Sequence, residues 1–115
     1  MGNRLGKWQD QLKETSSDTT HTIYAPIVPD GEVWRCQRLA VRNSTTAAAD
    51  VLVSIEKGGV KTYLYYFSNI TVNEWSSVAL ETLVFPTDRL CFDFSGVVNA
   101  ELVEVHITGT KKFES

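Results

Sequence analysis

Histidine and cysteine, on which metal sites and many catalytic sites depend, are scarce in this chain, with two of each among 115 residues. The four side chains are His21, Cys36, Cys91 and His106, the number of ligands that a structural zinc site needs. No two of them stand at the spacings typical of zinc ligands, so no single turn supplies a pair. We therefore predict that the protein holds no metal and no cofactor.

Long apolar runs and a dominant charge are also missing. No stretch approaches the roughly 18–20 apolar residues of a membrane-spanning helix, and residues 1–20 lack the apolar centre of a secretion signal. The 11 basic and 14 acidic side chains are interspersed and leave a net charge of −3, which is not the basic footprint of a nucleic-acid-binding protein. We expect no membrane and no nucleic-acid partner, synthesis in a cytoplasm, and two free thiols in place of a Cys36–Cys91 disulfide.

Signatures of catalysis are absent from the sequence as well. It contains no Gly-X-Ser-X-Gly nucleophile elbow. Asp93 and Glu104 suggest a carboxylate pair of the kind that glycosidases use, but both fall on the polar parity of their strands, where an ionised acid is ordinary. We therefore expect no enzymatic activity and assign no catalytic residue.

What the sequence does contain, from residue 21 onward, is an alternation of apolar and polar residues with period two, the pattern of strands that bury one face. Turn signals recur at roughly ten-residue intervals, among them Pro-Asp-Gly at residues 29–31 and Gly-Gly at residues 58–59. Seven or eight short strands without intervening helices predict an all-β, mostly antiparallel β-sandwich of jelly-roll or immunoglobulin-like type. We assign this domain to residues 21–115.

The predicted core consists of the apolar side chains at every second position of three predicted strands. Its members are Val51, Val53, Ile55, Leu90, Phe92, Phe94, Val103, Val105 and Ile107. In residues 33–43 the apolar pair Trp34 and Cys36 stands at even positions, and the apolar pair Leu39 and Val41 stands at odd positions. A β-bulge near residues 37–38 is therefore needed to bury the apolar side chains of both halves of that strand. The inward side chains there would be Trp34, Cys36, Leu39 and Val41.

Residues 1–14 have a different period. Leu5, Trp8 and Leu12 are spaced three and four apart, which places them on one face of a helix. Residues 15–20 are polar and have the composition of a linker. We predict that residues 1–20 form a helical arm and linker, which docks on a neighbouring subunit through Leu5, Trp8 and Leu12; packing on its own sandwich is the alternative.

The strand predicted after the Gly-Gly turn is apolar on both faces, with Tyr63, Tyr65 and Phe67 on one and Leu64 and Tyr66 on the other. One sandwich core cannot bury both faces, so a second contact is expected. A subunit interface, a covering segment of the same chain and a sugar-stacking platform are the alternatives. We take Tyr63, Tyr65 and Tyr66 as interface residues and expect a homo-oligomer, since symmetric assembly is the usual way to cover such a surface.

Several of these features recur together in a known pattern. A Val-Pro-Asp-Gly turn at residues 28–31 precedes a strand that carries Trp34 and ends at an Asn-Ser-Thr loop, and a Gly-Gly hairpin and an acidic turn before Leu90 follow. In these features residues 22–109 resemble small β-sandwich virion proteins of tailed bacteriophages. The chain departs from the pattern at residues 87–90, Thr-Asp-Arg-Leu, which lack the glycine of the late turn.

The resemblance implies a structural role in a virus particle, as a capsid decoration, neck or tail accessory protein. It implies other virion subunits as partners and, by analogy with decoration proteins, a trimer. It carries over no cofactor and no catalytic residue. A carbohydrate- or receptor-binding module of a tail or fibre is the competing interpretation.

Overall fold

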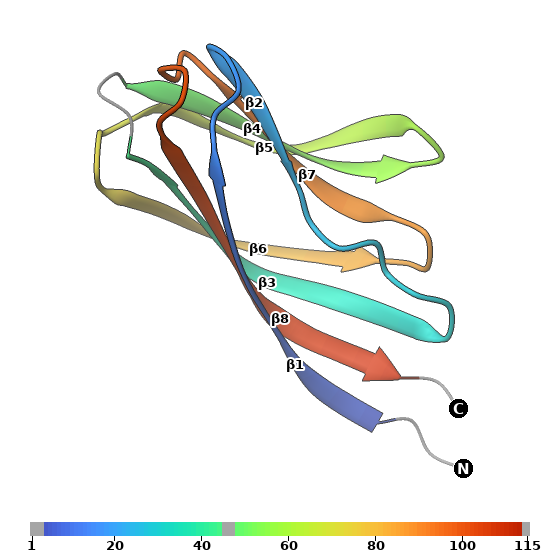
Figure 1. Ribbon diagram of the computed structural model, residues 1–115. Helices are drawn as coiled ribbons and strands as arrows, with labels where there is room; N and C mark the ends of the chain where they lie inside the picture. The colour runs from blue at the N-terminus through green and yellow to red at the C-terminus, as the bar shows by residue number, and fades with distance from the viewer. Residues whose placement is uncertain (1–3, 45–47, 114–115) are drawn as a thin grey trace.

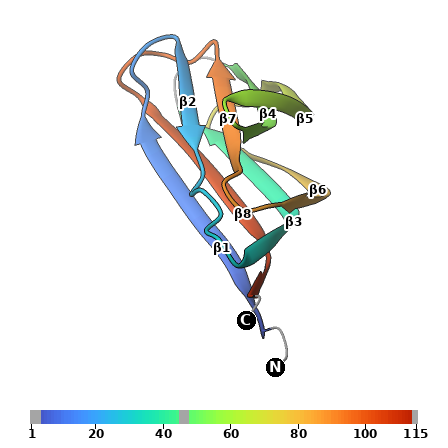
Figure 2. The ribbon, with the colours of Figure 1, turned by 90° about the vertical axis from the view of Figure 1, so that its right-hand side faces the viewer.

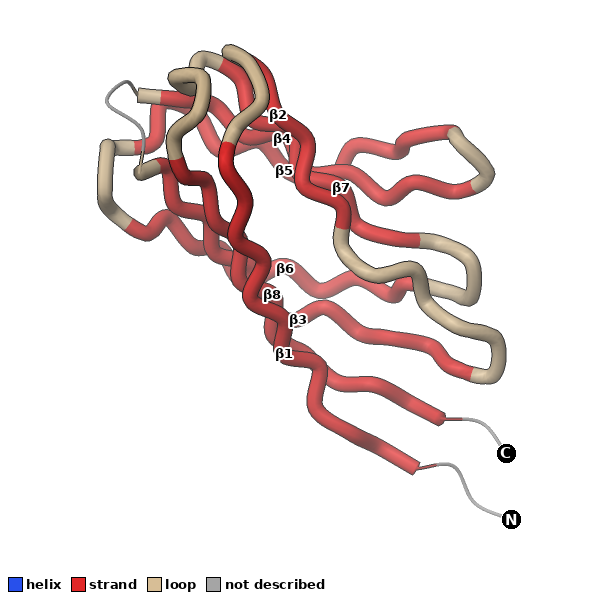
Figure 3. Tube along the Cα trace, in the orientation of Figure 1, coloured by secondary structure: helices blue, strands red, loops and turns tan. Residues whose placement is uncertain are grey.

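The computed structural model describes residues 4–44 and 48–113, whose regular structure consists of eight strands without a helix (Figures 1 and 3). The strands are β1 (Arg4–Thr15), β2 (Thr20–Tyr24), β3 (Glu32–Asn43), β4 (Ala49–Lys57), β5 (Val60–Ile70), β6 (Trp75–Val84), β7 (Arg89–Ser95) and β8 (Leu102–Phe113).

The strands form two four-stranded antiparallel sheets, which lie one above the other in Figure 1. Sheet A has the order β1-β8-β3-β6, and sheet B has the order β2-β7-β4-β5. Only the β4–β5 hairpin, which turns through Gly58 and Gly59 with positive φ angles of 57° and 82°, stays within one sheet. This interleaved order is that of the eight-stranded jelly roll, so the expectation of an antiparallel β-sandwich is confirmed.

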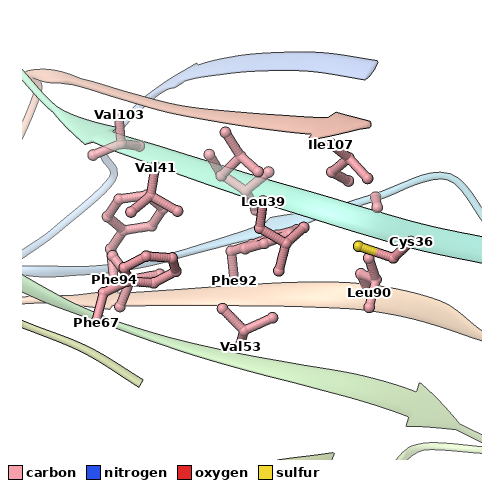
Figure 4. Packing of buried hydrophobic residues seen from close by; sticks show 14 of the residues in the cluster. Cys36, Leu39, Val41, Val53, Phe67, Leu90, Phe92, Phe94, Val103 and Ile107 are labelled. Carbon is pink, nitrogen blue, oxygen red and sulfur yellow. The ribbon is translucent and has the colours of Figure 1, made fainter. Parts of the chain in front are cut away.

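The core lies between the inner faces of the two sheets. Phe92 and Phe94 of β7 project toward Leu39 and Val41 of β3 (Figure 4). Of the nine core residues predicted from strand parity, eight are buried, and the remaining one, Ile55, is half-buried against them. The inward parity of these strands was therefore predicted correctly.

The predicted bulge in β3 is also confirmed. The registers of β3 with β6 and with β8 both shift between Cys36 and Arg38, and all four side chains expected to point inward are buried. Gly109 of β8 is the register partner of Cys36 at this bulge. A Cβ atom on Gly109 would lie 1.9 Å from the carbonyl oxygen of Arg35, so the close approach of the two backbones requires glycine.

We expect Gly109→Ala to lower the free energy of unfolding by at least about 3 kcal/mol, the upper range for overpacking, because backbone and not a movable side chain stands in the way. Gly6→Ala is a matched control in the same sheet, since its added Cβ would meet only the movable ring of Phe113, at 2.9 Å. Urea denaturation measures both. A Gly109→Ala loss below about 1 kcal/mol would contradict the close approach.

The predicted helical arm is wrong, because residues 4–15 form β1, which lies beside β8 along its whole length (Figure 2). Trp8 and Leu12 are an even number of residues apart and share one face of a strand, whereas Leu5 falls on the other. Trp8 is accordingly buried in the core at 1% exposure, Leu12 packs against the core, and Leu5 is 75% exposed. A short helix has little stability alone, while pairing with β8 gives the backbone hydrogen-bond partners.

The segment predicted as a linker is a structured corner between β1 and β2. The backbone N–H of Ser16 donates to the Glu101 carbonyl at 2.7 Å, and the Ser16 carbonyl accepts from the Ala100 N–H at 2.8 Å. The buried Ser16 hydroxyl also donates to the carbonyl of Val98. These bonds hold the corner against the loop between β7 and β8.

Replacement of Trp8 distinguishes a core strand from a detachable arm. We expect Trp8→Ala to cost about 3–5 kcal/mol of stability, as for other large buried side chains, because Trp8 lies inside the core against Trp34, with ring centroids 5.1 Å apart. Leu5→Ala on the same strand should change stability by no more than about 0.5 kcal/mol. Thermal and urea unfolding measure both, and equally small effects would favour an arm that docks elsewhere.

Candidate functional site

Tyr63, Tyr65 and Tyr66, the interface residues proposed from the sequence, all lie exposed on β5, the terminal strand of sheet B. The register of β5 with β4 shifts at Leu64, which stands opposite no single residue of β4. This irregularity brings Tyr63 and Tyr66 together on the outer face of sheet B, although simple alternation had separated them. The three tyrosines remain available at the surface, whereas Trp8 does not.

The side chains of Tyr65 and Tyr66 differ in their surroundings. Tyr65 lies at the rim of the core, edge-on to Phe67 with ring centroids 4.8 Å apart. The Tyr66 hydroxyl hydrogen-bonds the Asp50 carboxylate, which raises the pKa of Tyr66. The backbone N–H of Asn69 donates to the same carboxylate at 2.6 Å and, with Tyr66, lowers the pKa of Asp50. Tyr66 is therefore held in place by its hydroxyl group.

The charged side chains on the outer face of sheet B are paired with one another. Arg89 lies 2.9 Å from Glu56, and the Lys61 ammonium lies 3.2 Å from Asp93. The Arg89 guanidinium also lies over the ring of Tyr24, 4.0 Å from its centroid. We call this surface, with Tyr63 and Tyr66 at its β5 edge, the tyrosine face. These charged groups are paired within the protein, while the buried hydroxyl of Ser54, opposite Cys91 and Tyr63, has no hydrogen-bond partner among the described residues.

Cys91 lies on the outer parity of β7, with Asp93 and its register partner Leu52 beside it on the same face, yet it is fully buried. Burial raises the pKa of its thiol, and nearby charged groups, among them Glu56, Lys61 and Arg89, act on it as well. Cys36 lies in the core of sheet A, where burial raises its thiol pKa to about 11. Both thiols are free.

The raised pKa values predict the reactivity of the two thiols. With its pKa near 11, Cys36 should hold a thiolate fraction on the order of one in a thousand at pH 8, and only the thiolate reacts. We expect fewer than about 0.2 thiols per chain to react rapidly with a disulfide reagent in the folded protein. After denaturation without reductant, both should react. A fast-reacting thiol in the folded state would contradict the burial.

Leu5 lies on the outer face of sheet A, where it borders a shallow hollow of about 280 Å³ together with Val33 and Leu83. Arg35 also lines this hollow and forms an ion pair of 2.6 Å with Glu81 of β6. Leu5, Trp8 and Leu12 therefore do not form one surface. The fold sends the first to solvent and the other two toward the core.

Sequence reasoning missed an aromatic pair on the other half of this outer face. Trp75, the first residue of β6, is 39% exposed and stacks on His106 of β8, with ring centroids 4.2 Å apart and planes inclined by 34°. The parity of β6 contained a signal, because Trp75 shares its face with Ser77 and Ala79 while Val78 and Leu80 point inward. A tryptophan on the polar parity of a strand indicates a binding surface more than a core position.

One cluster of potentially catalytic groups lies at the corner between β1 and β2. His21 Nε2 lies 2.7 Å from Glu14, and the Ser17 hydroxyl lies 3.2 Å from His21 Nδ1. The backbone N–H of Ser17 donates to the same Nδ1 at 3.3 Å, so the hydroxyl shares that acceptor. The cluster ties β1 to β2, and therefore one sheet to the other, and this is the role that its geometry supports.

Other arrangements considered from the sequence are separated by the fold. Asp93 and Glu104 lie on the outer faces of opposite sheets and form no carboxylate pair. Within residues 4–44 and 48–113, His, Cys, Asp and Glu side chains nowhere gather in threes that could hold a metal ion. In the same part of the chain, no helix has the length and hydropathy needed to cross a bilayer.

Comparisons with known proteins give a likeness of structure only. No family model and no curated protein matches the chain. The structure of infectious bursal disease virus Gx strain is similar with a TM-score of 0.49 and 12% identity, and that of the Gt strain with a TM-score of 0.46 and 12% identity. Each match covers 96% of this chain and 31% of the viral chain.

A third structure, the infectious bursal disease virus VP2 subviral particle, has a TM-score of 0.36 and 11% identity, with 97% of this chain and 42% of that chain covered. The chain thus spans about a third of the length of the first two structures that it matches. The three likenesses are to viral particle proteins, at identities and scores that bear on neither family nor function.

Proposed function

We propose that the protein is a non-enzymatic structural subunit of a bacteriophage particle, a capsid decoration or head–tail accessory protein that binds other virion subunits. The pattern of turns and strands in residues 22–109, which resembles small phage virion proteins, supports this proposal. The jelly-roll strand order also supports it, since viral capsid and lectin domains share that architecture. Both are likenesses of fold, and a fold does not by itself indicate a function. The support for a function must therefore come from the surface of the protein.

The tyrosine face is the observation that carries the proposal. Tyr63 and Tyr66 are 69% and 52% exposed, beside charges that already pair with each other, such as Lys61 with Asp93. A partner that covers this face buries aromatic area without removing water from unpaired charges. Exposed aromatic side chains with satisfied polar neighbours are the composition of an interface centre.

The position of β5 adds a second means of association. Among the described strands β5 pairs with β4 alone, so its other edge presents backbone N–H and C=O groups without strand partners. Such an edge can accept a strand from another subunit. The tyrosines lie along this edge, so backbone pairing and side-chain contact would act at the same place.

A sugar is a poorer occupant of the tyrosine face than a protein. Saccharides are recognised through hydrogen bonds to their hydroxyl groups, and here Asp50 already binds Tyr66 and Asn69, while Glu56 is paired with Arg89. Few polar groups remain for a ligand. We therefore assign the tyrosine face to subunit contacts and propose a homo-oligomer, with a trimer preferred by analogy with decoration proteins.

A single charge on the tyrosine face tests the assembly. We expect Tyr63→Glu to raise the dissociation constant of the oligomer at least about tenfold, because an unpaired carboxylate would have to be buried in the contact. Leu83→Glu, at an exposed apolar position on sheet A, is the matched control and should leave the dissociation constant unchanged. Sedimentation equilibrium measures both. A wild-type protein that stays monomeric at high concentration would contradict the proposal.

The virion role has a separate test. Mass spectrometry of purified particles from infected cells should find the protein in a fixed ratio to the major capsid protein. A Tyr63→Glu virus should yield particles in which that ratio falls. Absence of the protein from purified wild-type particles would overturn the assignment to a virion, even if the isolated protein forms oligomers.

A further inference from the structure

The exposed half of sheet A around β6 differs from the tyrosine face in its polar groups. Of the three tryptophans in the chain, Trp8 and Trp34 are buried, and only Trp75 reaches the surface. It lies at the start of β6, where its register partner on β3 is Arg42, and Arg42 in turn stands opposite Glu104 of β8. Three strands thus bring an aromatic ring, a cation and a carboxylate into one row.

The next row explains how the tryptophan is held. Ala40 of β3 lies between Ser77 of β6 and His106 of β8. Its methyl group leaves room for the Trp75 ring to lean across β3 onto His106, where the two rings stack at 4.2 Å. His106 supports one side of the indole, while 39% of the Trp75 surface remains open to solvent. The result is an aromatic platform on the outer face of sheet A.

The polar groups around this platform form no hydrogen bond or ion pair with other described residues. Arg42 forms no hydrogen bond or ion pair, its Nε is buried without an acceptor, and its guanidinium carbon lies 5.9 Å from the centre of the Trp75 ring. Within residues 4–44 and 48–113, Glu104 and His106 form no hydrogen bond or ion pair either. An exposed aromatic ring with polar groups free to bond a ligand beside it makes this surface a candidate ligand site.

We propose that Trp75 and His106, with Arg42 and Glu104, form a binding subsite for the pyranose ring of a neutral saccharide. The apolar face of the sugar ring packs on the exposed part of the indole. Sugar hydroxyls both donate and accept hydrogen bonds, so they suit the donor Arg42 and the acceptor Glu104 together. A purely anionic ligand would be repelled by Glu104.

A protein partner fits this platform less well than a sugar. Covering Arg42 and Glu104 with apolar side chains would bury two charges without partners, which is strongly unfavourable. A saccharide instead offers a hydroxyl group to each. The saccharide subsite and the tyrosine face lie on opposite sheets. The saccharide proposal therefore does not depend on the proposed virion role, and an experiment can contradict one without the other.

The test uses the fluorescence of the full-length protein, in which Trp75 is the only tryptophan open to a quencher. Acrylamide quenching is measured with methyl glycosides of glucose, galactose, mannose and N-acetylglucosamine, and an array of neutral oligosaccharides extends the panel. We expect at least one of these saccharides to protect Trp75 from acrylamide and to bind the protein on the array.

Variants assign the binding to the platform. Trp75→Ala should weaken binding of that saccharide at least about tenfold, while Trp75→Phe, which keeps an aromatic ring, should retain part of it. Arg42→Gln should weaken binding without changing the unfolding midpoint. Tyr63→Ala on the opposite sheet is the control and should bind as the wild type does.

Three results would overturn the proposal. One is that no saccharide of the panel or array protects Trp75 or binds above the Trp75→Ala background. Another is that binding survives Trp75→Ala and disappears in Tyr63→Ala, which would place the sugar on sheet B. The third is that quenching of Trp75 falls as the protein concentration rises, which would show that a second copy of the chain occupies the platform.

Discussion

The contact between the inner faces of the two sheets is the interaction on which the rest of the structure depends. Phe92 and Phe94 of β7 oppose Leu39 and Val41 of β3, with Trp8 closing the core from β1. Burying one such side chain contributes about 1.5–3 kcal/mol, whereas a surface ion pair such as Arg35–Glu81 contributes at most about 1 kcal/mol. Burial of apolar side chains between the sheets, and not ion pairing at the surface, therefore stabilises the sandwich.

The residues of each strand that do not point inward form the two outer faces of the sandwich, and these faces differ in chemistry. On sheet B the charges pair with each other, as Lys61 does with Asp93, and exposed tyrosines stand beside them. On sheet A, Arg42 and Glu104 form no ion pair among the described residues, and Arg42 lies near the Trp75 ring. The first composition favours contact with another protein and the second favours a hydroxyl-rich ligand. One small fold thus offers two separate binding surfaces.

The predicted parts of the structure depend on local alternation. The change of parity between Cys36 and Leu39 was enough to predict the bulge, because a strand can bury both only with an extra residue between them. β1 was predicted wrongly because Trp8 and Leu12 share a face in a helix and in a strand alike. Only Leu5 tells the two apart, and the strand's partner, β8, lies almost the whole chain away.

The sequence by itself determined the strands after residue 20, their turns and the inward residues of β3, β4, β7 and β8, since alternation and turn chemistry act over a few neighbouring positions. Only the tertiary structure decided what covers each outward residue. Cys91 has outward parity and is nevertheless buried, among charged side chains of β4, β5 and β7 that act on its thiol. Trp75, Arg42 and His106 come together from three strands through register. Register between distant strands results from packing of the whole sandwich, and no local pattern contains it.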